Sequence, residues 1–302
     1  MKILITGGAG FIGSHLAIKL VSLGHKVVIL DNFESGNINN LLPIKQKVKI
    51  IKGSIEDKKL VEQSVDGIDT IFHLAAKITI QDSFRKQKEF KNINSYQTYN
   101  LLKSAQKKRI RKFIFSSSAA VYGDSKKLPL CEIKKPIPIS PLGKTKFEAE
   151  RYCALFKKKG MDVIIYRFFN VYGPGQNPNH LNVIPGFIKK ILSNEPPIIY
   201  GDGYQTRDFV YIDDVIESCI AGLKKEKNNN FIFNIGSGKE TSINSLLEIL
   251  SKLLNKKQKV KYFNKRKGDI KRSLACICQA QRYLKFKPKE SLTDGLSKVI
   301  GE

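Results

Sequence analysis

The stretch KILITGGAGFIGSHLAIKL, residues 2–20, joins an apolar run to an amphipathic helical pattern through a group of glycines. Gly8, Gly10 and Gly13 have the spacing G-x-G-x-x-G, and Gly7 comes immediately before them. Glycines at these positions allow a tight turn and a close approach of the backbone to a pyrophosphate. The N-terminus of the following helix adds amide donors and the positive end of its dipole. The stretch therefore predicts a strand, a turn and a helix that bind a dinucleotide.

The next apolar run, VVILDN, contains Asp31, 18 residues after Gly13. An acidic side chain at this place can accept hydrogen bonds from both hydroxyls of an adenosine ribose. The same carboxylate would repel a 2′-phosphate, and no Arg follows within the next several residues. The sequence therefore favours NAD over NADP as the cofactor.

Apolar runs rich in β-branched residues alternate with longer helical patterns as far as about residue 170, which predicts a Rossmann-type α/β fold with a doubly wound parallel sheet. After Asn170 the pattern changes to Gly/Pro-rich loops with shorter elements. We expect residues 1–169 to form an NAD-binding domain that also receives about 208–232. We expect residues 170–302 to form mainly a smaller α/β substrate-binding domain, interleaved with the first. The six runs are KILIT, KVVIL, VKIIKG, TIFHLA, KFIFSS and DVIIYRFF.

Length and composition indicate a folded protein, because 302 residues with 41% apolar content can bury a full core. No stretch approaches about 18 uninterrupted apolar residues, and the first residues lack the pattern of a signal peptide. We expect a cytoplasmic protein without a membrane partner. The net charge of +26 comes from Lys residues spread along the whole chain, so we interpret it as a solvated basic surface rather than a nucleic-acid site.

The cysteines are odd in number and scattered, and they stand far from any pair of His residues, which argues against a disulfide framework and against a zinc site. Only the spacing Cys276-x-Cys278 resembles part of a metal site, and we expect no metal. The cysteines are Cys131, Cys153, Cys219, Cys276 and Cys278.

Several longer stretches carry a resemblance that covers nearly the whole chain. The chain resembles the extended short-chain dehydrogenase/reductases of the nucleotide-sugar epimerase/dehydratase family, and within it the UDP-glucose and UDP-N-acetylglucosamine 4-epimerases. The stretches are ITGGAGFIGSHL, DNFESG, IFHLAA, KFIFSSSAAVYGD, SPLGKTKFEAE, YRFFNVYGPGQ, GDGYQTRDFVYIDDV, FNIGSG and KGDIKRSLA.

The resemblance implies a catalytic Tyr-x-x-x-Lys pair and a Ser or Thr beside it, at the sugar C4. In such enzymes the Tyr removes the 4-hydroxyl proton as a hydride passes to NAD, and the hydride then returns to the opposite face of the sugar. A nearby Lys ammonium lowers the Tyr pKa towards neutrality, where general-base catalysis is most effective. Lys146 matches the family lysine and Ser118 the family hydroxyl, but Leu142 stands where the family has Tyr.

Three interpretations of Leu142 stay open. The chain has lost the chemistry and kept binding, or the base has moved to Tyr122, Tyr166 or a water, or Leu142 replaces Tyr in an active parent. The neighbours of Leu142 match the family, which indicates a local loss. We predict an NAD-dependent nucleotide-sugar 4-epimerase that is impaired by Leu142. The alternatives are a non-catalytic protein that binds NAD or a nucleotide sugar, and another NAD-dependent enzyme that modifies nucleotide sugars.

The resemblance also implies which residues hold NAD. Ser54 departs from the family, which usually has Asp there to reach the adenine. Lys77 follows HLAA where Gln is common, and either meets the pyrophosphate or points to solvent. The implied cofactor-binding residues are Gly7, Gly10, Phe11, Ile12, Gly13, Asp31, Asn32, Ser54, Ile55, Leu74, Ala75, Ala76 and Lys146.

For the nucleotide sugar, the resemblance implies phosphate contacts from arginines, whose planar fork pairs with phosphate oxygens. Ala119 and Ala120 follow Ser118 where dehydratases carry Asp-Glu, which favours an epimerase. Ser273 matches a position where a bulky aromatic side chain excludes a 2-acetamido group, so it leaves room for one. The family also implies a homodimer formed by two helices of each subunit. The implied substrate-binding residues are Ser118, Asn170, Arg207, Arg266, Asp269 and Ser273.

Overall fold

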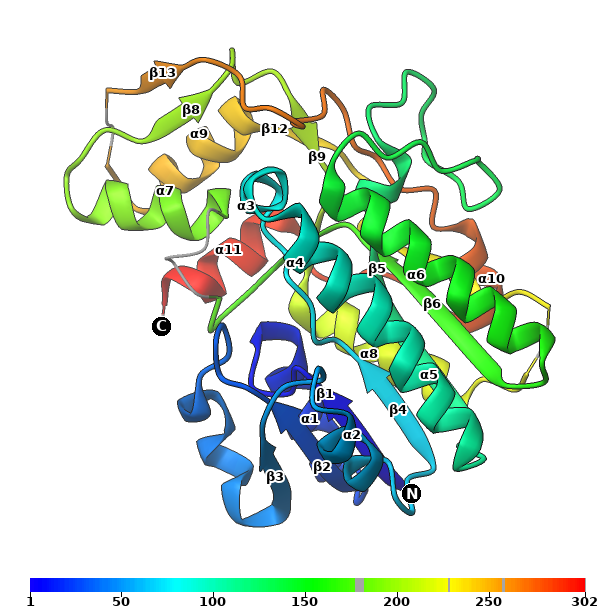
Figure 1. The fold of residues 1–302 in the computed structure, drawn as a ribbon. Helices are drawn as coiled ribbons and strands as arrows, with labels where there is room; N and C mark the ends of the chain where they lie inside the picture. The colour runs from blue at the N-terminus through cyan, green and yellow to red at the C-terminus, as the bar shows by residue number, and fades with distance from the viewer. Residues whose placement is uncertain (177–181, 228, 257–258, 302) are drawn as a thin grey trace.

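The computed structural model describes residues 1–176, 182–227, 229–256 and 259–301, and its centre is a sheet of seven parallel strands (Figure 1). All six apolar runs of the first half form strands, which confirms the predicted parallel α/β sheet. In sheet order the strands are β3 (Val48–Lys52), β2 (Lys26–Asp31), β1 (Lys2–Thr6), β4 (Thr70–His73), β5 (Lys112–Ser118), β6 (Asp162–Phe168) and β11 (Ile232–Ile235).

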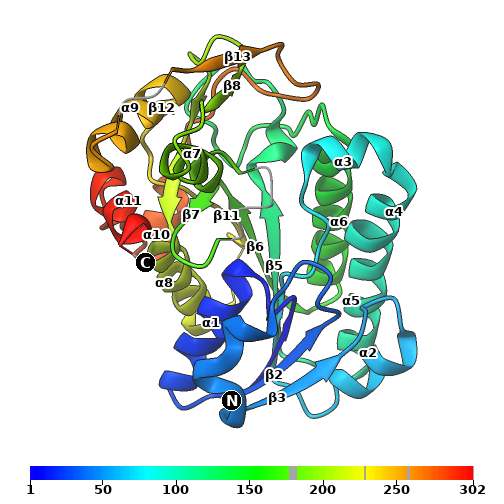
Figure 2. The same cartoon turned by 90° about the vertical axis from the view of Figure 1, so that its left-hand side faces the viewer.

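Helices cover both faces of this sheet, with α1 and α8 on one side and α5 and α6 on the other (Figure 2). Side chains alternate between the faces, so Ile3 and Ile5 pack with α1 and α8 while Leu4 packs with α2, α5 and α6. Strands buried on both faces explain why the runs are apolar throughout. The bounds are α1 (Phe11–Ser22), α8 (Ile212–Lys224), α2 (Lys58–Ser64), α5 (Gln97–Lys107) and α6 (Pro141–Lys158).

The residues after Asn170 gather mostly beyond one end of the sheet, around α7, α9 and the pair β8 and β13 (Figure 1). Two segments return to the sheet, because α8 packs against α1 and β11 pairs with β6. Phe187 and Leu246 belong to the same buried cluster as Ile5 and Leu16, so the two parts share one core. The smaller elements are β7 (Asn170–Tyr172), α7 (Val183–Leu192), β8 (Ile198–Tyr200), β9 (Thr206–Arg207), β10 (Phe209–Tyr211), β12 (Thr241–Ser242), α9 (Ile243–Leu253), β13 (Lys261–Phe263), α10 (Cys278–Leu284) and α11 (Leu292–Ile300).

Short helical segments connect the strands of the first half. A π-helical turn interrupts the helices between β4 and β5, and such turns are frequent at functional sites. No helix in the described ranges is long and apolar enough to cross a membrane. These segments are η1 (Ile38–Lys47), α3 (Ile80–Arg85), α4 (Gln87–Lys91), the π-helical η2 (Asn92–Tyr96) and η3 (Ala119–Tyr122).

Candidate functional site

The glycine turn lies between β1 and α1, where the strand order of the sheet reverses. Gly7 has a φ of +73°, in the region that favours glycine, and its N–H donates to Leu30 O at 2.9 Å. A Cβ on Gly13 would lie only 2.1 Å from Gly7 O, so the first turn of α1 lies directly on the glycine turn. Phe11 and Ile12 begin α1, where backbone N–H groups lack helical partners. The turn therefore fits the diphosphate of a dinucleotide.

We expect Gly13→Ala to destabilise the protein and to remove its ability to retain NAD. The added Cβ would overlap the backbone of Gly7 and of Gly8, at 2.1 and 2.8 Å. Relieving such an overlap typically costs about 1–3 kcal/mol and would displace the turn. The measurements are thermal unfolding and the amount of NAD that copurifies.

The matched control is Gly186→Ala in α7, because no atom lies within 4 Å of the added Cβ. Alanine is the better helix former by about 1 kcal/mol, so this variant should be as stable as the original chain or more stable. Equal stability of the two variants would contradict the close approach of α1 to the glycine turn.

Asp31, the last residue of β2, has a buried carboxylate that the backbone holds in place. Its Oδ2 accepts from Ala9 N at 2.9 Å, and its Oδ1 accepts from Phe33 N at 2.8 Å. Each oxygen keeps a lone pair for a further donor, as two ribose hydroxyls require. Asn32 is exposed, and its Oδ1 accepts from Glu34 N at 3.1 Å. The carboxylate is therefore pre-positioned beside the glycine turn.

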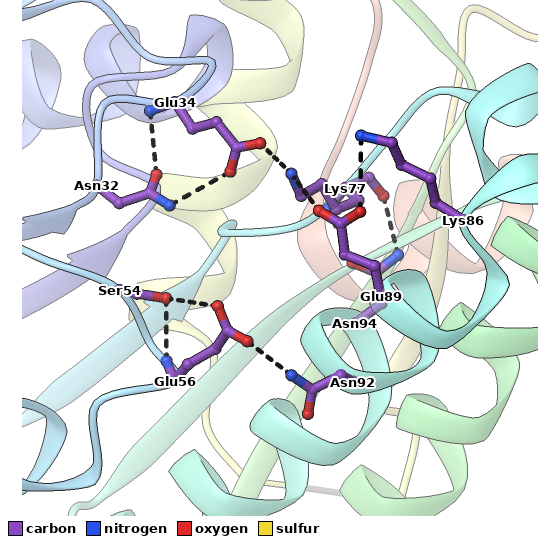
Figure 3. A network of polar contacts seen from close by, with 9 residues as sticks. All are labelled: Asn32, Glu34, Ser54, Glu56, Lys77, Lys86, Glu89, Asn92 and Asn94. Carbon is purple, nitrogen blue, oxygen red and sulfur yellow. Dashed lines mark hydrogen bonds and ion pairs between the residues drawn. The ribbon is translucent and has the colours of Figure 1, made fainter.

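Ser54 and Ile55 follow β3, where the sequence lacks the family's Asp. Ser54 Oγ donates to Glu56 Oε2 at 3.1 Å, and Asn92 Nδ2 donates to Glu56 Oε1 at 2.7 Å (Figure 3). The sequence analysis missed Glu56, although it stands two residues after Ser54. The structure thus places a carboxylate next to the position where the family has one.

Leu74, Ala75 and Ala76 follow β4, the neighbour of β1 in the sheet. Ala75 N lies 3.3 Å from Thr6 Oγ1 and donates to it, and a Cβ on Gly7 would lie 2.7 Å from Ala75 N. The segment that follows β4 therefore contacts the glycine turn closely, as a shared cofactor site requires.

Lys77 does not point freely to solvent. Its Nζ forms ion pairs with Glu34 and, at 2.8 Å, with Glu89 Oε1 (Figure 3). Burial acts to lower the pKa of Lys77, but the bonds to the two carboxylates outweigh it and raise the pKa. Asn94 holds the backbone of Lys77 on both sides, since it donates to the carbonyl at 2.9 Å and accepts from the N–H at 2.8 Å. The expectation that Lys77 points to solvent was therefore wrong, and its contact with the pyrophosphate stays a prediction.

Ser118 ends β5, and Leu142 and Lys146 lie one helical turn apart near the start of α6. Ser140 caps this helix by accepting from Gly143 N at 3.1 Å. A Cβ on Gly143 would lie 2.4 Å from a backbone oxygen of η3, the segment directly after Ser118. The close packing of α6 on η3 therefore brings all three predicted catalytic positions to one edge of the sheet.

Lys146 is buried, and its environment differs from that of a surface lysine. Its Nζ donates to Ser116 O at 2.7 Å and lies 5.0 Å from the centroid of the Phe115 ring. Burial lowers the pKa of Lys146 to about 8. Leu142 is also buried and has no titratable group. Ser118 Oγ accepts from Ala120 N at 3.2 Å, which leaves its proton free for another acceptor.

The two tyrosines considered as replacement bases are not suited to that role. Tyr122 OH donates to Asn234 Oδ1 at 2.7 Å and accepts from Arg167 Nη1 at 2.9 Å, and burial raises its pKa to about 12. Tyr166 OH donates to Ser218 O at 2.7 Å, and burial raises its pKa well above the ordinary value. A general base works best with a pKa near the working pH, so these environments disfavour both tyrosines, and the identity of a replacement base stays a prediction.

A buried ion pair, which the sequence analysis missed, supports this region. Arg167 Nε and Nη2 donate to the two oxygens of Glu150 at 2.9 and 2.7 Å, and both side chains are almost fully buried. Ser117 also donates to Glu150. Glu150 lies one turn after Lys146 on α6, so the pair ties the helix to β5 and β6. The sequence feature that could have indicated this ion pair is the lone Arg within the apolar run DVIIYRFF.

His73, at the end of β4, is buried between two threonines. Thr98 donates its hydroxyl to Asn94 O at 2.8 Å, so it accepts from His73 Nε2 at 2.9 Å. The Nδ1 atom then accepts from Thr6 Oγ1 at 2.7 Å. Burial, with a smaller effect from the charge of Lys146, lowers the pKa of His73 to about 3.

The depressed pKa of His73 should make stability depend on pH. The unfolded chain binds the His73 proton below about pH 6.5, whereas the folded protein binds it only near pH 3, so stability is lost as the pH falls between these values. The slope from this group is at most about 1.4 kcal/mol per pH unit. We expect His73→Gln to reduce the slope of unfolding free energy against pH, measured with urea at about pH 4.5, 5.5 and 6.5. An unchanged slope would contradict a neutral, buried imidazole.

Arg207 and Asp269, both predicted to bind substrate, form an ion pair with each other. Arg207 Nη1 also donates to Thr206 O at 2.8 Å and to Ile270 O at 2.9 Å. Burial lowers the pKa of Arg207, while the Asp269 carboxylate opposes this effect. The guanidinium is therefore held in one orientation by the chain itself.

The other predicted substrate residues have separate environments. The Arg266 guanidinium stacks on the Tyr200 ring, 3.5 Å from its centroid. Asn170 is exposed, and its backbone N–H donates to Asp208 O at 2.9 Å. Ser273 is 1% exposed, and its Oγ has no hydrogen-bond partner in the described part of the chain.

Among the described residues, no group of three or more His, Cys, Asp or Glu side chains is arranged to hold a metal ion.

Comparisons with known proteins identify related sequences and folds. The model of the NAD dependent epimerase/dehydratase family matches residues 3–236. A putative UDP-glucose 4-epimerase of Methanocaldococcus jannaschii is 39% identical, over 99% of this chain and 97% of its own length.

Two solved structures are similar over nearly their full length. A UDP-N-acetylglucosamine 4-epimerase from Methanobrevibacter ruminantium, in complex with UDP-N-acetylmuramic acid, is 37% identical with a TM-score of 0.94, and the match covers 99% of this chain and 97% of that one. A UDP-glucuronic acid 4-epimerase from Bacillus cereus, in complex with UDP-glucuronic acid and NAD, is 34% identical with a TM-score of 0.92, covering 100% and 98%.

Proposed function

Because this chain belongs to the NAD-dependent epimerase/dehydratase family, we propose that it binds NAD and a UDP-sugar and is a 4-epimerase whose turnover is reduced by Leu142. The observation that carries the proposal is the arrangement of the glycine turn, Asp31, Ser118 and Lys146 at the carboxyl edge of one parallel sheet. In open α/β sheets, ligands bind outside this edge.

The glycine turn and Asp31 fit NAD by their shape and charge. The turn has no room for a Cβ at Gly7 or Gly13, and α1 directs unpaired N–H groups towards it. The Asp31 carboxylate is held by two backbone donors and can accept from ribose hydroxyls. Ser54 and Glu56 stand at the end of β3, where the adenine would lie. NAD, when bound, supplies a nicotinamide that accepts a hydride and returns it.

The chain's own residues account for the remaining parts of the chemistry. The Ser118 hydroxyl would donate a hydrogen bond to the oxygen on the sugar C4, and Lys146 would hold the nicotinamide ribose. The Lys146 ammonium would lower the pKa of a phenol one turn away, but Leu142 offers no phenol. Without a positioned base, turnover is lower by about 10²- to 10⁴-fold.

For the substrate, we propose that Arg207 and Arg266 pair with the diphosphate, together with Asn170. Asp269 orients Arg207 for this contact. The buried Ser273, whose hydroxyl lacks a partner, leaves room for a 2-acetamido group, so both UDP-glucose and UDP-N-acetylglucosamine are candidate substrates.

A second candidate is a protein that binds NAD and the UDP-sugar without turnover. Leu142 favours it, and so do the hydrogen bonds and raised pKa values of Tyr122 and Tyr166, which make both tyrosines poor bases. Of the three replacement bases named above, a water molecule then fits best. Ala119 and Ala120 support an epimerase ancestry over a dehydratase in either case.

We further propose a homodimer formed through α5 and α6, the helices that the family uses. The two helices pack side by side, with the Tyr99 and Tyr152 rings 5.0 Å apart. Tyr96 and Leu155 near them are 46% and 41% exposed, which supports a contact surface there. We also propose that the chain divides into an NAD-binding domain and a substrate-binding domain at residue 169.

The proposal is tested by calorimetric binding of UDP-glucose and UDP-N-acetylglucosamine to the chain loaded with NAD. We expect binding of at least one sugar nucleotide, weakened by Arg266→Met and unchanged by Lys265→Met. Lys265 is exposed on the same segment, so the control removes the same charge. No binding of either ligand would overturn the proposal. Binding to RNA that falls steeply with salt and ignores UDP-sugars would favour a nucleic-acid role instead.

A further inference from the structure

Three of the five cysteines lie together, although one of them is far away in the sequence. Cys276 lies close enough to Cys131 and to Cys278 to affect the ionisation of both thiols, and Cys131 Sγ donates to Pro129 O at 3.6 Å. All three are free thiols, with Cys278 exposed and the other two partly exposed. The sequence indicated only the neighbours Cys276 and Cys278. The fold adds Cys131 and makes Cys276 the central sulfur of a three-thiol cluster.

The backbone places Cys131 and Cys276 side by side on two paired segments. Leu130 and Ala275 form a parallel β-bridge, and each is followed directly by one of the two cysteines. Cys276 N donates to Leu130 O at 2.9 Å, and Leu130 N donates to Leu274 O at 2.8 Å. Neighbouring strands lie about 4.8 Å apart, within the roughly 4.4–6.8 Å between Cα atoms that a disulfide spans. The pairing therefore suits a disulfide without a large backbone movement.

The two segments connect the two halves of the candidate site. The first follows η3, and so lies shortly after Ser118 in the chain. The second contains Ser273, which is buried and whose hydroxyl has no hydrogen-bond partner among the described residues. Lys271 N donates to Asp124 Oδ1 at 2.7 Å, which adds a second tie between the segments. A covalent bond between them would hold the Ser273 segment against the first half of the chain.

We infer that Cys131 and Cys276 are a redox site, at which a small-molecule disulfide such as glutathione disulfide produces a reversible cross-link that restrains the Ser273 segment. The Cys276 thiolate attacks one sulfur of the external disulfide and expels one small thiol. Cys131 then attacks the Cys276 sulfur of this mixed disulfide and expels the second small thiol. Two cysteines are oxidised, one external disulfide is reduced, and both cysteine protons end on the released thiols.

The environment of the flanking thiols agrees with this order of attack. Burial, with a smaller effect from the neighbouring Cys276 thiol, raises the pKa of Cys131 to about 11. The neighbouring Cys276 thiol also raises the pKa of Cys278. The Cys131 thiol also donates to Pro129 O at 3.6 Å, which favours its protonated form, so Cys131 acts second and Cys276 attacks first.

The test oxidises the full chain with glutathione disulfide and maps the cross-links by mass spectrometry after digestion without reductant. We expect a Cys131–Cys276 link that dithiothreitol reverses, and that Cys278→Ser retains and Cys131→Ser abolishes. Because the link closes a loop of well over 100 residues, the Tm of the oxidised protein should rise by on the order of 5 °C. Cys153 and Cys219 are fully buried and should stay unreacted as internal controls.

A Cys276–Cys278 link alone, or glutathione adducts without any cross-link, would overturn the assignment. The restraint of the Ser273 segment is measured separately, by the association rate of a UDP-sugar, and this measurement rests on the proposed function. Association of UDP-N-acetylglucosamine should be slower in the oxidised protein by on the order of tenfold, and unaffected by oxidation in Cys131→Ser. Equal association rates with the link present would overturn the restraint but not the redox site. Absence of UDP-sugar binding in the reduced protein would instead be a failure of the proposed function.

Discussion

Replacing Leu142 with Tyr is expected to raise UDP-sugar 4-epimerase turnover by about 10²- to 10⁴-fold. The new phenol would stand one helical turn before Lys146, whose ammonium favours the phenolate. Ser118 and Lys146 already lie at the same edge of the sheet, so the substitution restores one missing group. The measurement is conversion of UDP-glucose and of UDP-N-acetylglucosamine in the presence of NAD.

The matched control is Leu142→Phe, which adds the same ring without the hydroxyl. Leu142 is 5% exposed, so both variants enlarge a buried side chain and should change stability by similar amounts. Turnover in the Tyr variant alone would assign the gain to the phenol. Equal turnover in the original chain and both variants would mean that another base acts, and inactivity of a stable, NAD-loaded Tyr variant would contradict the epimerase proposal for these substrates.

Arg167→Met is expected to destabilise the protein by about 3–5 kcal/mol, because it leaves the Glu150 carboxylate buried without its partner. Both side chains are almost fully buried, and the pair is bidentate. Tyr122 would lose its donor from Arg167 at the same time. Chemical denaturation measured by circular dichroism tests the change in unfolding free energy.

The double variant Glu150→Leu with Arg167→Met provides the control. Removal of both charges avoids an unpaired buried ion, so the double variant should be more stable than Arg167→Met alone. Additive losses of unfolding free energy from the two substitutions would contradict a coupled pair.

Because Glu150 lies one turn after Lys146 on α6, we also expect Arg167→Met to weaken NAD retention.

The parts of the fold that local pattern determines were predictable. Each of the six apolar runs became a strand, since continuous apolar residues bounded by turns suit strands covered on both faces. The glycine turn was predictable for a similar reason, because the lack of room for a Cβ at Gly13 arises from Gly7 and Gly8, which are close in sequence. The partners of Lys77 were not, since Glu34 follows β2 and Glu89 lies in α4, and these segments approach only in the folded chain (Figure 3).

The sequence by itself determined the parallel sheet, the dinucleotide turn and the Asp31 carboxylate, because each depends on residue type and short-range spacing, and its resemblance to the family indicated the missing phenol at Leu142. Only the tertiary structure decided which buried polar groups are already paired. It showed that Tyr122 and Tyr166 donate to fixed acceptors, and it brought Cys131 to Cys276. Hydrogen bonds and burial of this kind join residues far apart in the chain, and no local pattern encodes them.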